Sequence, residues 1–169
     1  NSFGSIYGFR YKGVYQYDKY EEGRGGTAPV VRDVNGNVVK DANGKPLPMY
    51  FDYFNLGNKR YQFRGGDAIY EDINHDGTID ELDIVYLGNS NPKLTGGFGT
   101  NITFKNFSIS AFFNFRYGNK IVNYARMDAE NMHSNNNQSI AVNWRWRKDG
   151  DVTEMPRALY NYGYNYLGS

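Results

Sequence analysis

The residues best placed to do chemistry in this chain form an acidic loop between residues 72 and 83. Its sequence, D-I-N-H-D-G-T-I-D-E-L-D, follows the calcium-loop pattern D-x-[DN]-x-[DN]-G, with an acidic residue in the twelfth position. Oxygen atoms at these spacings converge on one cation only if the chain wraps around it, and Gly77 permits the sharp turn this requires. The predicted ligands are Asp72, Asn74, Asp76, Thr78 (through its backbone carbonyl), Asp80 and Asp83.

Ca²⁺ is the expected ion, because such a loop surrounds the metal with oxygens, whereas Mg²⁺ keeps most of its waters. Asp83 is one methylene shorter than the Glu that usually closes the loop, as in dockerin-type loops. Gly65 and Gly66 lie just upstream, so an EF-hand with two flanking helices is not expected. Ile79 is expected to pack inward and hold the loop to its host. The alternative is an acidic loop held by its own hydrogen bonds, without metal.

The composition excludes several classes of protein. Among 169 residues the net charge is only +1, which argues against a nucleic-acid partner. Cys is absent, so disulfides and thiolate metal sites are excluded. No apolar run reaches the roughly 18 residues of a transmembrane helix, but a barrel whose strands alternate apolar and polar residues remains open. Any export signal is expected to lie outside these residues.

No catalytic constellation is present in the sequence, and we predict that the chain is not an enzyme. There is no Ser/His/Asp arrangement, no Cys nucleophile and no phosphate-binding loop. Asp128 and Glu130 lie two residues apart in a polar stretch and are interpreted as solvated charges. His75 and His133 lack ligand spacing and are interpreted as surface residues.

Residues 95–117 predict the clearest architectural element, a hairpin of two ten-residue strands joined by Lys105-Asn106. A two-residue loop places residue 104 opposite 107 and, on the same face, 102 opposite 109 and 98 opposite 113. Phenylalanines and isoleucines then share one face. The other face is mostly Thr, Ser, Asn and Gly, and a slip of one residue would destroy this sorting. The apolar face meets either a soluble core or lipid. Ten residues match the roughly 9–11 of a tilted membrane strand.

The ordered motifs of the chain resemble the C-terminal half of the SusC/RagA family of TonB-dependent outer-membrane transporters. The resemblance covers most of the chain and is far more specific than the calcium loop alone. The residues that carry it are 66–80 (GDAIYEDINHDGTID), 87–92 (LGNSNP), 95–98 (TGGF), 117–119 (YGN), 7–9, 13–16, Trp146, 150–151 and 156–158. Ser90 stands where the family often has Pro.

The resemblance implies an all-β fold, namely a segment of a 22-stranded transmembrane antiparallel barrel with long extracellular loops and a calcium-loop insert. It implies import of oligosaccharides or peptides across the outer membrane, with a SusD-like surface lipoprotein as lid and TonB–ExbB–ExbD supplying energy. The plug and the TonB box are not among these residues.

The resemblance also divides the chain into segments. Residues 1–18 are expected to form a strand or its extracellular extension, with an aromatic and a polar face, in which Gly4, Gly8 and Gly13 are candidate bulges or bends. Residues 19–66 are an extracellular loop with small hairpins, because D-x-N-G occurs at 33–36 and 41–44. Residues 67–88 hold the EF-hand-like calcium loop, 95–117 the transmembrane hairpin and 118–169 a second extracellular loop.

Three questions stay open at this stage. A secreted, soluble calcium-loop module of dockerin type is the main alternative function. Trp144 and Trp146 suit sugar stacking, but packing against neighbouring loops is the favoured interpretation. Four further aromatics are expected to contact either a glycan or the lipoprotein lid, namely Tyr160, Tyr162, Tyr164 and Tyr166.

Overall fold

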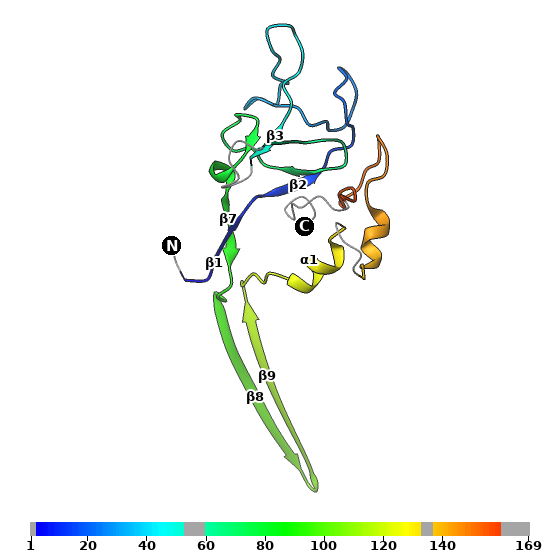
Figure 1. Ribbon diagram of the computed structural model, residues 1–169. Helices are drawn as coiled ribbons and strands as arrows, with labels where there is room; N and C mark the ends of the chain where they lie inside the picture. Colours follow the sequence, from blue (N-terminus) through cyan, green and yellow to red (C-terminus); the bar gives the residue numbers. More distant parts are fainter. Residues whose placement is uncertain (1–2, 53–59, 133–136, 160–169) are drawn as a thin grey trace. The chain divides into compact units, whose positions relative to one another are not determined.

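The computed structural model describes residues 3–52, 60–132 and 137–159. The chain divides into two compact units, each considered by itself: Asn1–Gly8 with Tyr86–Val122, and Phe9–Val85 with Asn123–Ser169. Strands make up much of the first unit, whereas the described part of the second unit is mainly loop with short strands and helical turns (Figure 1). Within the described ranges, no helix is both long enough and apolar enough to cross a membrane.

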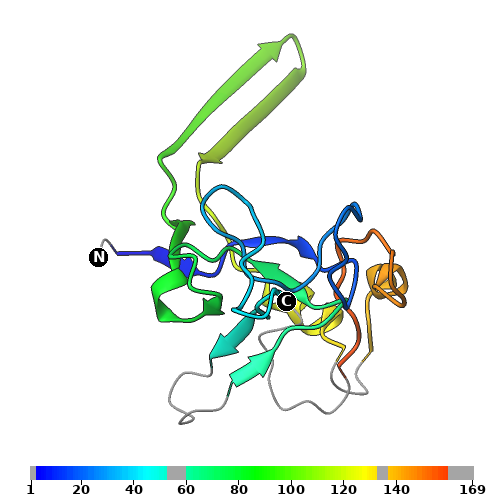
Figure 2. The ribbon, with the colours of Figure 1, turned by 90° about the horizontal axis from the view of Figure 1, so that it is seen from above.

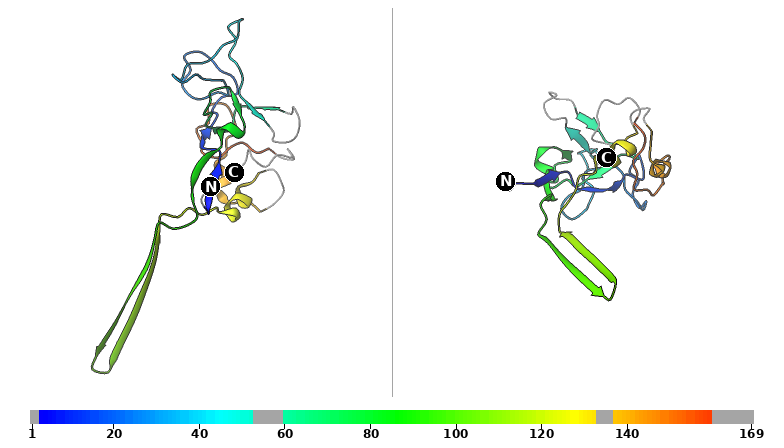
Figure 3. Two further views of the ribbon diagram at one scale, coloured as in Figure 1. Left: turned by 90° about the vertical axis from the view of Figure 1, so that its left-hand side faces the viewer. Right: turned by 90° about the horizontal axis from the view of Figure 1, so that it is seen from below.

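The first unit contains the predicted hairpin, β8 (Leu94–Phe104) and β9 (Phe107–Tyr117), whose two strands run side by side along their whole length (Figures 2 and 3). Every predicted pair is present, from Phe104 opposite Phe107 to Thr95 opposite Arg116. Lys105 adopts a φ of 53°, the positive value that a two-residue hairpin loop between right-twisted strands requires. The register predicted from loop length is therefore confirmed.

The apolar face of this hairpin is uncovered. Phe98, Ile102 and Phe113 are 62 %, 58 % and 54 % exposed, and the rings of Phe98 and Phe113 stack across the strands. Two glycines on β8 lie under aromatic rings of β9, because a Cβ on Gly96 would meet Phe115 and one on Gly99 would meet Phe112. Among the described strands, none pairs with the outer edge of β8 or of β9. A two-stranded hairpin is at best marginally stable in water, so this element needs neighbours.

The other strands of the first unit are β1 (Ser5–Gly8) and β7 (Val85–Asn89), which pair with each other. An edge-to-face contact between Tyr7 and Tyr86 and a hydrogen bond from the Ser90 N–H to the Gly4 carbonyl extend this pairing. β7 runs directly toward β8, so the pairing leads into the hairpin.

The second unit holds two small sheets. β2 (Tyr11–Val14) pairs with β5 (Ala68–Tyr70). β3 (Tyr50–Asp52) lies between β4 (Arg60–Gln62), which runs antiparallel to it, and β6 (Thr78–Ile79), which runs parallel. The core between them is aromatic and aliphatic: Tyr15, Val31, Met49, Phe51, Phe63, Ala68, Tyr70 and Ile79.

The two D-x-N-G segments fold as the predicted turns. In the first, the Asp33 carboxylate accepts the N–H groups of Asn35 and Asn37, at 2.9 and 2.8 Å. In the second, the Asp41 carboxylate accepts the N–H groups of Asn43 and Lys45, both at 2.9 Å. The glycine of each turn has positive φ, 83° and 76°. The bonds to the Asp33 carboxylate, above all that from Asn37, hold the pKa of Asp33 below its usual value.

Two expectations about the elements need correction. The single strand expected within residues 1–18 is two short strands, β1 and β2, which pair with different partners. Gly13, with a φ of 123°, lies where the register of β2 shifts, and a bulge of this kind interrupts the alternation. The expected loop 118–169 contains a short helix, α1 (Tyr124–Glu130), and a one-turn 3₁₀ helix, η2 (Ile140–Trp144). The Asn123 side chain caps α1.

Candidate functional site

The acidic loop lies between β5 and β7 in the second unit. A strand, β5, precedes it, and a single 3₁₀ turn, η1 (Glu81–Asp83), ends it, so the flanking helices of an EF-hand are absent as expected. Ile79 is completely buried in the core, which confirms its predicted inward packing. Tyr50 and Phe51 of β3 pair with Thr78 and Ile79. The second half of the loop is therefore anchored to a sheet.

The predicted ligands take part in hydrogen bonds within the loop. The Asp72 carboxylate accepts the N–H of Gly77 at 2.9 Å, and Gly77 has a φ of 82°. The Asp76 carboxylate accepts the N–H of Thr78 at 2.8 Å and the Asn74 side-chain amide at 2.8 Å. These bonds wrap the chain into the tight arc expected of residues 72–78.

The end of the loop is organised by Asp83, which is fully buried. Its carboxylate accepts the N–H of Ile73 at 2.7 Å and that of Asp80 at 3.0 Å, and the Asp80 side chain caps η1 by accepting the Leu82 N–H. Burial raises the pKa of Asp83, while the two backbone hydrogen bonds oppose that shift. Asp83 therefore ties the first residues of the loop to the last.

One oxygen in the loop suits a cation. Asp72 Oδ1 is buried and has no hydrogen-bond partner among the described residues. A buried carboxylate oxygen without a donor is costly, and a bound cation would satisfy it. Because every carboxylate oxygen has more than one lone pair, the N–H bonds to Asp76 and Asp83 leave those oxygens with further acceptor capacity. The donor set, all oxygen, fits a hard cation such as Ca²⁺.

The loop carboxylates are not drawn together around one point. Within the part of the chain that the structure describes, no three Asp, Glu or His side chains are placed to hold a metal ion. The geometry shown is that of an acidic loop held by its own hydrogen bonds.

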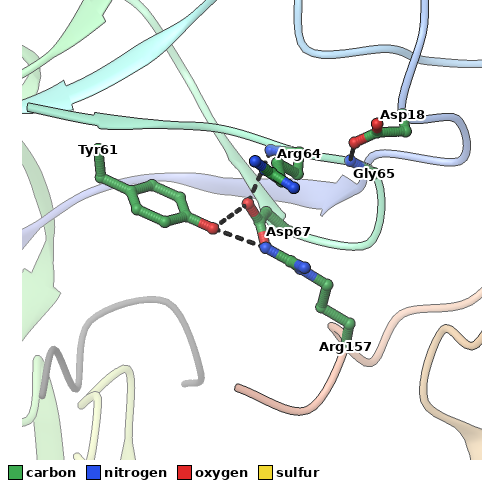
Figure 4. A network of polar contacts seen from close by, with 6 residues as sticks. All are labelled: Asp18, Tyr61, Arg64, Gly65, Asp67 and Arg157. Carbon is green, nitrogen blue, oxygen red and sulfur yellow. Dashed lines mark hydrogen bonds and ion pairs between the residues drawn. The ribbon is translucent and has the colours of Figure 1, made fainter. Parts of the chain in front are cut away.

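A second constellation, which the sequence did not predict, joins residues far apart in the chain (Figure 4). Asp67 is fully buried in its side chain, and its carboxylate accepts the Arg157 Nε–H at 2.6 Å, the Tyr61 hydroxyl at 2.8 Å and the Arg64 N–H at 2.8 Å. Arg157 also donates to the Tyr61 oxygen at 2.7 Å. Burial alone would lower the pKa of Arg157, but the hydrogen bond and charge of Asp67 raise it. Burial and the Asp67 charge raise the pKa of Tyr61.

Gly66 connects this network to Trp146. Gly66 has a φ of 84°, and a Cβ at this position would lie 2.3 Å from Cε3 of Trp146. The Gly66 carbonyl accepts the Arg157 N–H, and the Trp146 indole N–H donates to the Gln16 carbonyl at 3.1 Å. Trp146 therefore packs within the unit, as favoured from the sequence. Gly66, Asp67, Trp146 and Arg157 all belong to the motifs that carry the SusC/RagA resemblance, which was the available signal that they meet.

Most of the remaining residues singled out in the sequence lie at the surface or outside the described residues. Trp144 is 76 % exposed. Glu130 forms an ion pair with Arg126 at 2.8 Å, and Asp128 lies exposed on the same helix. His75 is exposed in the acidic loop, with a φ of 58°. His133 lies outside the described residues, as do Tyr160, Tyr162, Tyr164 and Tyr166.

Comparison with known proteins gives one consistent result. TonB-dependent receptor P39 of Formosa agariphila is 30 % identical over an alignment of 188 positions, which covers 99 % of this chain and 17 % of the receptor. TonB-dependent receptor P3 of the same organism is 27 % identical over 92 % of the chain and 12 % of its own length. TonB-dependent receptor P26 is 31 % identical over 55 % of the chain and 9 % of its own length. No protein-family model matches the chain.

The chain thus spans about a sixth of the length of the first of these relatives. The similarity runs through both units and includes the hairpin and the acidic loop, because it covers almost the whole chain. The chain is homologous to a segment of TonB-dependent receptors, in agreement with its being a fragment of a TonB-dependent transporter.

Proposed function

We propose that this chain is part of the barrel of an outer-membrane TonB-dependent importer of the SusC/RagA type. Its cargo is an oligosaccharide or a peptide. A SusD-like lipoprotein covers the extracellular mouth, and TonB–ExbB–ExbD energises import through parts of the protein outside these residues. The hairpin β8–β9 crosses the membrane in contact with lipid, and the loops of the second unit lie outside the cell.

The observation that carries this proposal is the hairpin β8–β9, which has an apolar face and a mostly polar face and whose apolar side chains are exposed. Each strand has eleven residues. At about 3.3 Å per residue and a tilt of about 45°, such a strand spans roughly 26 Å along the membrane normal, close to the ~25 Å apolar band of outer-membrane barrels. Its two-residue turn at Lys105-Asn106 suits the periplasmic side, where turns are short. The Phe98, Ile102, Ile109 and Phe113 side chains form an apolar face that suits hydrocarbon.

A matched pair of substitutions tests the orientation of the hairpin. Phe113→Lys places a charge near the middle of the apolar face, where Lys costs about 2–4 kcal/mol in a barrel. Asn114→Lys, the next residue, places the same charge on the opposite face, toward the wet lumen, and is expected to cost little. The readout is the fraction of full-length protein in outer membranes that shows heat-modifiable mobility in SDS gels. Equal yields for both variants would refute the orientation, and recovery of the full-length protein in soluble fractions would favour the dockerin-like alternative.

We further propose that the acidic loop binds Ca²⁺ through the predicted residues Asp72, Asn74, Asp76, Thr78, Asp80 and Asp83. The support is the loop spacing together with the unpartnered, buried Asp72 Oδ1. The ion would neutralise charge on the four ligand carboxylates among the five in these twelve residues, and it would restrict the loop.

Calorimetric titration of the full-length protein with Ca²⁺ tests this site. The expected result is heat that EDTA reverses and that Asp72→Asn abolishes. Asp33→Asn, in an acidic turn outside the loop, is the control and is expected to leave the heat unchanged. Hydrogen exchange of residues 72–83 should speed up when Ca²⁺ is stripped. Absence of EDTA-reversible heat would leave the hydrogen-bonded, metal-free loop as the correct description.

A further inference from the structure

We infer that the polar face of the hairpin β8–β9 holds a subsite for an acidic sugar, so that the cargo is an oligosaccharide bearing carboxylate or sulfate groups. This inference rests on the proposed function, which turns that face toward the lumen of the barrel. Phe112, Asn114 and Arg116 occupy alternate positions of β9 and therefore share the polar face. A ring, an amide and a guanidinium thus follow one another along the strand.

Phe112 is an aromatic side chain on a face that otherwise carries Thr, Ser, Asn, Gly and Arg. A Cβ on Gly97 would lie 3.2 Å from Cζ of Phe112, and one on Gly99 would lie 2.9 Å from its Cδ2, so the ring lies across both glycines. The side chain of Phe112 is nevertheless 70 % exposed. The face of an aromatic ring carries partial negative charge, which attracts the C–H groups of a sugar ring. Phe112 therefore offers a stacking surface for a sugar.

Asn114 and Arg116 supply polar groups beside this ring. Both side chains are exposed, and within the described ranges neither forms a side-chain hydrogen bond or an ion pair. Together with Thr95 they line a hollow of about 610 Å³ at the end of the hairpin opposite its turn. An amide both donates to and accepts from a hydroxyl group, and the planar guanidinium matches the oxygens of an acidic group. The hollow can therefore hold a hydroxyl group and an anionic group together.

The charge of the first unit favours an anion at this place. Residues 1–8 and 86–122 contain no Asp or Glu and four cationic residues, namely Lys93, Lys105, Arg116 and Lys120. All 18 acidic residues of the chain, and every ion pair among the described residues, belong to the second unit. Only Lys105 lies at the turn, whereas Lys93 directly precedes β8 and Lys120 follows β9. Cations without acidic partners attract an anionic cargo and repel a cationic one.

The geometry favours a sugar over two other anions. An anionic lipid headgroup would meet the apolar face, which carries Phe113 and Phe115, whereas Arg116 lies on the opposite face with Asn114. An extended peptide gains most of its affinity by adding to the edge of a sheet through main-chain hydrogen bonds. The ring, the amide and the guanidinium stand on the face of the sheet, where a stacked sugar reaches all three.

Binding of soluble ligands to the full-length protein, purified in detergent, tests the subsite. The panel holds neutral, uronic-acid-containing and sulfated oligosaccharides of matched length, together with acidic peptides. We expect the tightest ligand to be an acidic oligosaccharide, with a Kd that Arg116→Gln raises roughly 10- to 100-fold through loss of a charge-assisted hydrogen bond. Phe112→Leu keeps an apolar side chain but removes the ring face, and should raise the same Kd roughly 3- to 10-fold. Lys105→Gln removes a cation at the turn and is the control, with an unchanged Kd.

The inference would be overturned if a neutral oligosaccharide or an acidic peptide were the tightest ligand, or if no member of the panel bound. An equal loss of binding in Lys105→Gln and Arg116→Gln would also overturn it, because the effect would then come from net charge alone. If Arg116→Gln changed only the amount of co-purified lipid, Arg116 would be a lipid contact and the subsite would be wrong. Heat-modifiable mobility in outer membranes is measured for each variant and for the unchanged protein. A barrel that keeps this mobility but fails the binding test refutes the subsite alone, whereas absence of the unchanged protein from outer membranes refutes the proposed function.

Discussion

Removing Arg157 should destabilise the second unit more than breaking a surface ion pair would. Asp67 is fully buried in its side chain and Arg157 is 25 % exposed in its own, so Arg157→Met leaves a buried carboxylate without its cation. Breaking a buried pair costs about 3–5 kcal/mol. The Tyr61 hydroxyl and the Arg64 N–H still donate to Asp67, which places the expected cost near the lower end, about 3 kcal/mol. This corresponds to a change on the order of 100-fold in local opening.

Hydrogen exchange with mass spectrometry on the full-length protein measures this opening directly. The amides of residues 61–70 should lose protection by roughly 100-fold in Arg157→Met. The control is Arg10→Met, which breaks an ion pair with Glu71 whose side chains are 49 % and 26 % exposed. Such pairs are worth about 0–1 kcal/mol, so less than about fivefold is expected there.

A second variant separates charge from packing. Adding Asp67→Asn to Arg157→Met removes the stranded charge and should recover part of the lost protection. Unchanged protection in Arg157→Met, within a factor of three, would refute the view that this ion pair holds the unit together.

Three further outcomes follow from the same unit. Gly66→Ala places a Cβ 2.3 Å from Trp146 at a φ of 84°, so a loss of about 1–3 kcal/mol and a shift in indole fluorescence are expected. Burial, and then the charge of Glu154, raises the pKa of Tyr11 to about 12. This pKa lies above the unfolded value of about 10, so the contribution of Tyr11 to the free energy of unfolding is complete below pH 10 and is lost as the pH rises toward 12. In a profile of stability against pH, Tyr11→Phe should remove this loss. Asp41→Ala removes the acceptor of two N–H groups, so exchange should accelerate in residues 41–45 and stay unchanged in residues 33–37.

The parts of the fold that the sequence predicted correctly are local. The register of β8 and β9 depends on a two-residue loop and on alternation within 23 residues, both visible in the sequence. The turns at Asp33 and Asp41 depend on side chains that bond to N–H groups two and four residues on. In the acidic loop, Gly77 and Ile79 take the roles expected of them. The metal ligands named from the loop spacing stay a prediction.

The parts that the sequence did not predict are non-local. Asp67 and Arg157 are 90 residues apart, and no periodicity connects them. The parallel pairing of β3 with β6 is decided by burial of Phe51 and Ile79 in one core. The arrangement of the loop carboxylates is set by backbone N–H groups that bond to the oxygens a cation would also need. The spacing of the residues in the sequence does not reveal these bonds.

The open edges of β8 and β9 have a consequence for biogenesis. About half of the residues of each strand direct their N–H and C=O groups outward, and no described strand pairs with these edges. Beside a row of phenylalanines, such edges make a template on which another extended chain can add. Until neighbouring strands cover it, this hairpin is therefore exposed to cross-β aggregation.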